Sequence, residues 1–198
     1  MGKLKNYQKI KKVNGLRKTM KSKQKKLDQQ LFSSTKADDN YKVTVSVLGN
    51  RKAQHVSIKD ANNNAIVETN SDILSLLQQA TNDVFNQINT SRNQLFHDAT
   101  KELIDESDKT KTVNKELQKE QEQLNQNDFK GLGQLSLDND KKPTVIFDFK
   151  GDYSCYNVNV VNIENLSEGK LSRLLTKAIN NGIGNINLAT DVLYDKYQ

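Results

Sequence analysis

The side chains with the clearest chemical potential are basic, and they are concentrated at the start of the chain. Residues 1–27 contain no aspartate or glutamate but hold eleven basic side chains: Lys3, Lys5, Lys9, Lys11, Lys12, Arg17, Lys18, Lys21, Lys23, Lys25 and Lys26. Lysines contact phosphates as flexible point charges and release condensed counterions, which gives affinity without discrimination between bases. The single arginine and the single aromatic residue, Tyr7, argue against base-edge readout or stacking on single strands. The segment is therefore suited to sequence-independent contacts with phosphates, although a lysine-rich helix can also be an ordinary solvated face.

Residues that usually carry catalysis or bind metals are few. Those considered are His55, His97, Cys155, the aspartates at 38, 39, 138 and 140, and the glycine motifs at 131–133 and 182–184. One cysteine and two histidines do not supply a closely spaced set of four zinc ligands. The aspartates are typical of turns, and neither glycine motif has the strand-to-helix context of a dinucleotide loop. We expect no enzyme activity, no cofactor and no metal site.

The composition restricts the class of protein. Of 198 residues, 34% are hydrophobic and 27% charged, so the core must be thin. The net charge of +6 combines the basic N-terminal segment with a mildly acidic remainder, an asymmetry that points to nucleic acid or to an anionic membrane surface. One cysteine excludes an internal disulfide, no apolar run approaches the roughly 20 residues that span a bilayer, and the N-terminal lysines precede no apolar signal region. We therefore expect a cytoplasmic location, in the nucleoid.

In the first half, the hydrophobic pattern predicts a long helix, a strand pair and a second helix. Residues 3–33 carry one apolar stripe of helical spacing, made of Ile10, Val13, Met20, Leu27 and Leu31. The alternation of Val43, Val45 and Val47, the turn sequence LGNRK at 48–52 and the segment 53–58 predict a β-hairpin. A helix capped by Asn70 or Ser71 should follow, with an apolar face formed by Ile73, Leu77, Ala80, Val84, Ile88 and Leu95.

The second half predicts the same plan. A helix is expected at 112–125, a strand and turn at 131–140, and a strand pair in TVIFDFKGDYSCYNVNVVN after Pro143. The last helix carries an apolar face formed by Leu171, Leu175, Ala178, Ile186, Ala189 and Leu193. The glycines at 182 and 184 weaken this helix, so we expect tertiary packing to hold it, through a close backbone contact.

The two halves also align. An offset of 102 brings Gly49 onto Gly151 and Val43 onto Val145, and an offset of 98 aligns the helices around Asn82 and Asn180. The difference falls in the loop before the helix, where insertions are cheap. We interpret this as an internal duplication, with one unit at residues 1–108 and a degenerate second unit at 109–198.

The first unit resembles a known family. The stretches YKVTVSVLGNRKAQHVSIKD and LLQQATNDVFNQI are similar to the strand, turn and helix pattern of the YbaB/EbfC family of nucleoid-associated DNA-binding proteins. The resemblance covers roughly residues 3–105 and, more weakly, 112–198. It implies an α+β dimer whose sheets pack together while helices project as arms that engage DNA. Family members are about half this length, so the resemblance implies a pseudo-dimer within one chain.

The expected function is therefore a non-enzymatic, sequence-tolerant DNA-binding protein that uses the eleven basic residues. The arms should be unequal, because the segment NKELQKEQEQ that matches the lysine helix is acidic and glutamine-rich. Two alternatives stay open. One is a protein-interaction adaptor or chaperone that kept the fold, whose partner is another protein or a second copy bound through the sheets. The other is peripheral binding to anionic membranes, although the helix lacks the aromatic and leucine-rich face that such helices bury.

Overall fold

The computed structural model describes residues 15, 18–101, 109–135, 144–163 and 166–196. Within these ranges the chain is α+β, with four helices and two three-stranded antiparallel sheets. The elements in chain order are a first helix described over residues 18–29, β1 (Leu31–Ala37), β2 (Tyr41–Leu48), β3 (Ala53–Asp60), α2 (Ser71–Lys101), α3 (Lys109–Gln126), β4 (Asp128–Gln134), β5 (Thr144–Lys150), β6 (Cys155–Val161) and α4 (Glu168–Asp195). The order of helix, three strands and helix thus occurs twice.

Alternating apolar residues build the inner face of each sheet. Val43, Val45 and Val47 of β2 are fully buried, and so are Phe147 and Phe149 of β5. Each sheet has the order of its strands in sequence, with antiparallel pairing of the central strand to both neighbours. Because side chains alternate across a strand, the opposite faces carry mostly polar side chains, although Ile146 of β5 is half-buried there and Asp148 is buried.

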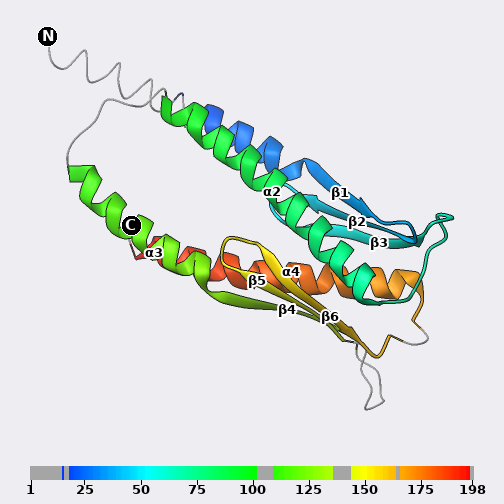
Figure 1. Ribbon diagram of the computed structural model, residues 1–198. Helices are drawn as coiled ribbons and strands as arrows, with labels where there is room; N and C mark the ends of the chain where they lie inside the picture. The colour runs from blue at the N-terminus through cyan, green and yellow to red at the C-terminus, as the bar shows by residue number, and fades with distance from the viewer. Residues whose placement is uncertain (1–14, 16–17, 102–108, 136–143, 164–165, 197–198) are drawn as a thin grey trace, which may run out of the picture.

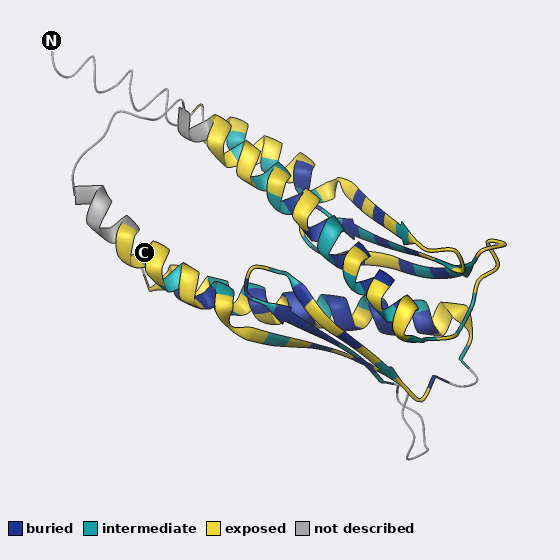
Figure 2. Ribbon diagram, in the orientation of Figure 1, coloured by how far each residue is buried: buried dark blue, intermediate teal, exposed yellow. Residues whose placement is uncertain are grey.

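The covering helices connect the two halves. Helix α2 packs on β1 and β2 and also reaches β6, whereas α4 packs on β4 and β5 and also reaches β3. The buried side chains form one continuous hydrophobic cluster that includes residues of both sheets and both helices. Figure 2 shows the buried residues gathered where these elements meet, while the helix ends that extend away from the sheets are mostly exposed.

One asparagine on each covering helix forms hydrogen bonds to an edge strand of the other half. Asn82 of α2 accepts a hydrogen bond from the backbone N–H of Cys155 (2.6 Å) and donates to its carbonyl (2.9 Å). Asn180 of α4 does the same with Ala53, at 2.7 and 3.1 Å. Cys155 and Ala53 begin β6 and β3, so each asparagine side chain satisfies a strand end that the sheet leaves unpaired.

Gly182 and Gly184 of α4 lie in different surroundings. A Cβ added at Gly182 would lie 2.6 Å from the Phe149 ring and 3.2 Å from the Cα of Gly131, so the helix backbone sits directly on β4 and β5 there. At Gly184 a Cβ would meet nothing within 4 Å. The expected close backbone contact is therefore found at Gly182, and it does not extend to Gly184.

The predicted elements differ from the structure mainly at the first sheet. The helix expected over 3–33 ends at Gln29, and residues 31–37 form β1, which the pattern did not predict. Leu31 is consequently 56% exposed rather than on the helix stripe, whereas Phe32 is buried. The strand expected at 131–140 begins earlier, at Asp128, and residues 136–143 lie outside the described part of the chain.

The remaining elements were predicted within a few residues. Both strand pairs with their turns, and the helices α2, α3 and α4, occupy the expected segments. Asn70, one of the two proposed caps, accepts a hydrogen bond from the backbone N–H of Ile73 at 2.9 Å. Leu95 and Ala189 are only half-buried, while the other residues of the two predicted apolar faces are buried.

Candidate nucleic-acid interface

The described part of the first helix presents a surface of lysines, here called the basic face: Lys18, Lys21, Lys23, Lys25 and Lys26, all exposed. Lys18, Lys21 and Lys25 have helical spacing that places them on one side, opposite the buried Leu27. No ion pair or hydrogen bond joins any of the five ammonium groups to another described residue. The other six predicted contact residues, Lys3, Lys5, Lys9, Lys11, Lys12 and Arg17, lie outside the described residues.

Apolar and polar contacts on the opposite side fix the orientation of this helix. Leu27 is buried, and a Cβ at Gly49 would lie 1.8 Å from the Leu27 carbonyl oxygen. The turn after β2 therefore approaches the helix end as closely as a glycine permits. This contact holds the lysines away from the sheet and toward solvent.

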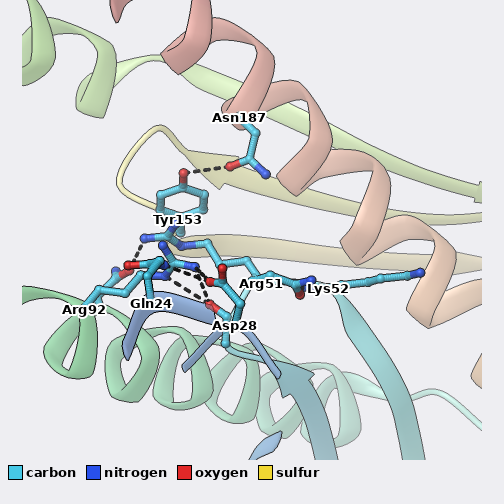
Figure 3. A network of polar contacts seen from close by, with 10 residues as sticks. Gln24, Asp28, Arg51, Lys52, Arg92, Tyr153 and Asn187 are labelled. Atoms are coloured by element: carbon cyan, nitrogen blue, oxygen red, sulfur yellow. Dashed lines mark hydrogen bonds and ion pairs between the residues drawn. The ribbon is translucent and has the colours of Figure 1, made fainter. Parts of the chain in front are cut away.

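The first acidic residue of the chain is neutralised within the protein. Asp28 forms an ion pair with Arg92 of α2 (2.6 Å), and Gln24 donates to the same carboxylate oxygen at 2.9 Å. Arg92 also donates to the carbonyl of Gly49, at 3.0 Å from Nε and 2.7 Å from Nη2. Figure 3 shows these side chains converging at the base of the first helix. Asp28 is thus occupied by an internal partner and does not pair with the basic face.

Beside this network, a cation–π contact joins the turns of the two sheets. Arg51, in the turn after β2, places its guanidinium 4.0 Å from the ring centre of Tyr153, in the turn after β5. Asn89 accepts from Arg51 Nη2 at 2.9 Å, and the Tyr153 hydroxyl donates to Asn187 at 2.9 Å. Both turn residues have positive φ, 66° and 71°. Burial is the main cause that lowers the pKa of Arg51, and the nearby Arg92 lowers it further.

A cleft of about 490 Å³ opens next to these turns. Its walls come from both halves of the chain, and it is called the interarm cleft below. The lining residues are Arg51, Asn89, Arg92, Asn93, Phe96, Gln121, Asn125, Gly151, Asp152, Tyr153, Thr190 and Tyr194. No motif in the sequence marks this region as a site, although Arg51 and Tyr153 occupy the same place in the two aligned turns.

The helix α3, the counterpart of the first helix in the second half, has no comparable basic surface among its described residues. In α3, exposed lysines alternate with glutamates, and Lys196 near the end of α4 pairs with Glu120 at 2.7 Å. Lys150 pairs with Asp128 at 2.7 Å, and this contact raises the pKa of Lys150 and lowers that of Asp128. Helix α3 thus presents charges of both signs, and other exposed basic residues of the second half lie on α4, at Lys170, Arg173 and Lys177.

The other candidate residues take structural positions. Cys155 is buried, and desolvation raises the pKa of its thiol to about 12, which keeps the unreactive protonated form. His55 is exposed, with Nδ1 3.3 Å from the Ser172 hydroxyl. Asp38 accepts hydrogen bonds from the backbone of Asn40 and Tyr41, as a turn aspartate does.

Among the described residues, no group of three or more histidine, cysteine or acidic side chains is placed to hold a metal ion. None of the described helices is both long and apolar enough to cross a bilayer. Comparison with known proteins adds no assignment: no family model, curated protein or solved structure matches the chain.

Proposed function

We propose that this protein is a non-enzymatic, nucleoid-associated protein that binds double-stranded DNA with little sequence preference. The observation that carries the proposal is the basic face, five exposed lysines on a helix whose first acidic neighbour is already paired with Arg92. Free ammonium groups on a rigidly anchored helix are suited to phosphates, and they supply no bidentate contact to base edges. We propose the other six basic residues of the segment 1–27, which lie outside the described residues, as further phosphate contacts.

We also propose that residues 1–108 and 109–198 are duplicated units that pair as an intramolecular pseudo-dimer, in the manner that the resemblance to the YbaB/EbfC family implies. The reciprocal contacts of Asn82 and Asn180 with the opposite strands support this. So do the β-bulges at Ser46/Val47 and Asp148/Phe149, which fall at the same place in the two sheets. Pairs of contacts that exchange the two partners are what a two-fold interface produces.

The pseudo-dimer gives two arms of different character. The first arm is the first helix with the C-terminal part of α2, and the second arm is α3 with the C-terminal part of α4. In the view of Figure 1 both helix pairs extend to the same side of the sheets. Only the first arm carries the basic face, so we propose a one-sided grip on the duplex, with the second arm making few phosphate contacts.

The experiment is the salt dependence of binding to a labelled duplex of about 30 bp, followed by fluorescence anisotropy. Contact with about 6–10 phosphates predicts a log–log slope near −5 to −9. The test variant replaces the five lysines of the basic face with glutamine. The matched control replaces five other exposed lysines with glutamine, so that the net charge changes equally: Lys42, Lys52, Lys115, Lys119 and Lys170.

The test variant should flatten the slope by up to about 4 units, whereas the control should change it by less than about 1. Equal losses in both variants would mean that net charge, rather than the basic face, governs binding. If the native protein does not bind duplex at low salt, the DNA proposal is wrong.

One observation favours a protein-interaction adaptor as the second candidate. Leu188 and Val192 are 65% and 64% exposed and lie one turn apart on α4. Such a pair is an apolar surface of the kind that partners cover. The adaptor becomes the favoured function if the native protein does not bind duplex DNA at low salt.

A further inference from the structure

The interarm cleft is lined by elements of both halves of the chain. Its lining comes from α2, α3 and α4 and from the turns after β2 and β5. A volume of about 490 Å³ is within the range of roughly 300–1,000 Å³ that small-molecule sites occupy. The cleft is therefore large enough for a ligand and is built by elements that the core holds in place.

Within the part of the chain that the structure describes, Arg51 forms no ion pair with an acid. Arg92 is paired with Asp28, whereas Arg51 contacts the amide of Asn89 and the ring of Tyr153, and Asp28 attracts it at longer range. The acid in the lining, Asp152, is exposed, and its Oδ1 accepts hydrogen bonds from the backbone N–H of Ser154 (2.9 Å) and from its hydroxyl (2.5 Å). An anion bound here would offset the repulsion between the two guanidinium groups and the cost of burying Arg51.

Two buried polar atoms of the lining also lack partners. In the described chain, four buried side-chain atoms have no hydrogen-bond partner, and two of them belong to this cleft: Nε of Arg51, a donor, and Oε1 of Gln121, an acceptor. Most buried polar groups in folded proteins are satisfied, and an exception needs an explanation such as a bound molecule. Both atoms are covered by neighbouring atoms in this conformation, so a ligand that satisfies both requires small turns of the two side chains toward the cleft. It must then accept a hydrogen bond from Nε of Arg51 and donate one to Oε1 of Gln121.

The rest of the wall is aromatic and amide in character. Phe96 and Tyr194 line the cleft and are 69% and 45% exposed. Asn93 and Asn125 add amide groups that can both donate and accept. Exposed aromatic rings and amides together are the groups on which nucleobases stack and with which base edges form hydrogen bonds.

We propose that the interarm cleft binds a nucleotide, with its phosphate at Arg51 and its base among Phe96, Tyr194 and Gln121. The phosphate oxygens accept from the arginine, and an N–H of the base donates to the glutamine carbonyl. The shared chemistry is a nucleoside phosphate, which is supplied either by a free mononucleotide or by one unit of a single strand. This site is separate from the basic face and does not depend on duplex binding.

The test follows the Nε–H signals of arginine in the ¹⁵N-labelled full chain during titration with inorganic phosphate, ribose 5-phosphate, AMP or a single-stranded hexanucleotide. The Arg51→Lys variant identifies the Arg51 signal by its loss, and it keeps the charge while removing the guanidinium fork. Gln121→Met keeps the length of the side chain and removes the acceptor. Arg173→Lys, an exposed arginine of α4 outside this cleft, is the matched control.

AMP should shift the Arg51 signal saturably and bind more tightly than ribose 5-phosphate. Arg51→Lys should lower the affinity for AMP about tenfold or more, as expected for the loss of a charged hydrogen bond. Gln121→Met should reduce the difference in affinity between AMP and ribose 5-phosphate. The control should bind as the native protein does. A higher affinity for the hexanucleotide than for AMP would identify a single strand as the ligand, and equal affinities would identify a free mononucleotide.

Three results would overturn the proposal. If no probe shifts the Arg51 signal at millimolar concentration, the cleft does not bind a nucleoside phosphate. If ribose 5-phosphate or phosphate binds as well as AMP, the ligand is not a nucleotide. If Arg51→Lys leaves the affinity for AMP unchanged, the site is elsewhere. Loss of nucleotide binding with the duplex salt slope intact would separate this failure from a failure of the basic face.

Discussion

The contacts between the covering helix and the first strand of the sheet differ between the two halves. In the first half, α2 meets β1 through polar side chains: Ser34 donates to Asp83 at 2.7 Å, and Lys36 forms an ion pair with the same carboxylate at 3.3 Å. At the same place in the second half, β4 carries Gly131 and Gly133, and added Cβ atoms there would lie 2.1 and 2.2 Å from backbone oxygens of α4. One interface uses side chains as spacers, and the other is contact between backbones.

This difference coincides with a difference at the ends of the helices. The half with direct backbone packing has a second arm of mixed charge, and the half with polar spacers carries the basic face. The same order of elements thus tolerates two ways of filling the space between helix and edge strand. We infer that the second half contributes chiefly to the shared core, while the first half contributes the proposed DNA contacts.

The largest expected effect comes from filling the backbone contact. Gly131→Ala should lower the free energy of unfolding by about 3 kcal/mol, because its Cβ would overlap the carbonyl oxygen of Ala178 and force α4 to move. Ser34→Ala, the matched change in the first half, removes one hydrogen bond and should cost about 1 kcal/mol. Urea unfolding of the two variants measures both values. Similar costs would show that the two interfaces do not differ as described.

The sequence predicted most of the elements but not this difference. Alternating valines and helical leucine spacing are local signals, and they located β2, β3, β5, β6, α2 and α4. The strand β1 was missed because Leu27 and Leu31 continue a helical spacing across the true helix end, and no proline or glycine marks the break before Phe32.

The interarm cleft could not be predicted for a different reason. Its walls come from segments as far apart as Arg51 and Tyr194, and no spacing rule brings these together. The alignment of the two turns placed Arg51 opposite Tyr153 in register, but only the packing of the two halves brings the guanidinium over the ring. The basic face, in contrast, was visible in the sequence because it lies on one continuous helix.

The two asparagine contacts should be equal where the two interfaces are unequal. Asn82→Ala leaves the backbone N–H and carbonyl of Cys155 unpaired, and Asn180→Ala does the same to Ala53. Each variant should lose about 2 kcal/mol of unfolding free energy. Asn185→Ala, which removes one exposed hydrogen bond to Lys130, is the control and should lose less than about 1 kcal/mol. If the losses for Asn82→Ala and Asn180→Ala differ from each other by more than the loss for Asn185→Ala, the two contacts are not equivalent, which would argue against a two-fold relation.

The smallest effect is a pH dependence that only the first half should possess. The hydrogen bond from Ser34 is the main cause that lowers the pKa of Asp83, with further contributions from Lys36 and Gln87. By the helix offset of 98, the matched residue of α4 is Asn181, which does not titrate and instead accepts from the backbone of Leu132 at 3.0 Å. Since the folded-state pKa of Asp83 is lowered, its ionised form adds stability above the unfolded pKa of about 3.9, and this is lost as the pH falls through the folded value.

Asp83→Asn keeps an acceptor for Ser34 and removes the charge, so it isolates this contribution. At neutral pH the variant should be less stable by under about 1 kcal/mol, because the carboxylate is partly exposed and screened. The difference from the native protein should vanish at a pH below the folded-state pKa, whereas Asn181→Ala should show a cost that does not change with pH. Urea midpoints measured between pH 2 and 7 at constant ionic strength check both, and a cost of Asp83→Asn that is independent of pH would remove the electrostatic distinction between the two interfaces.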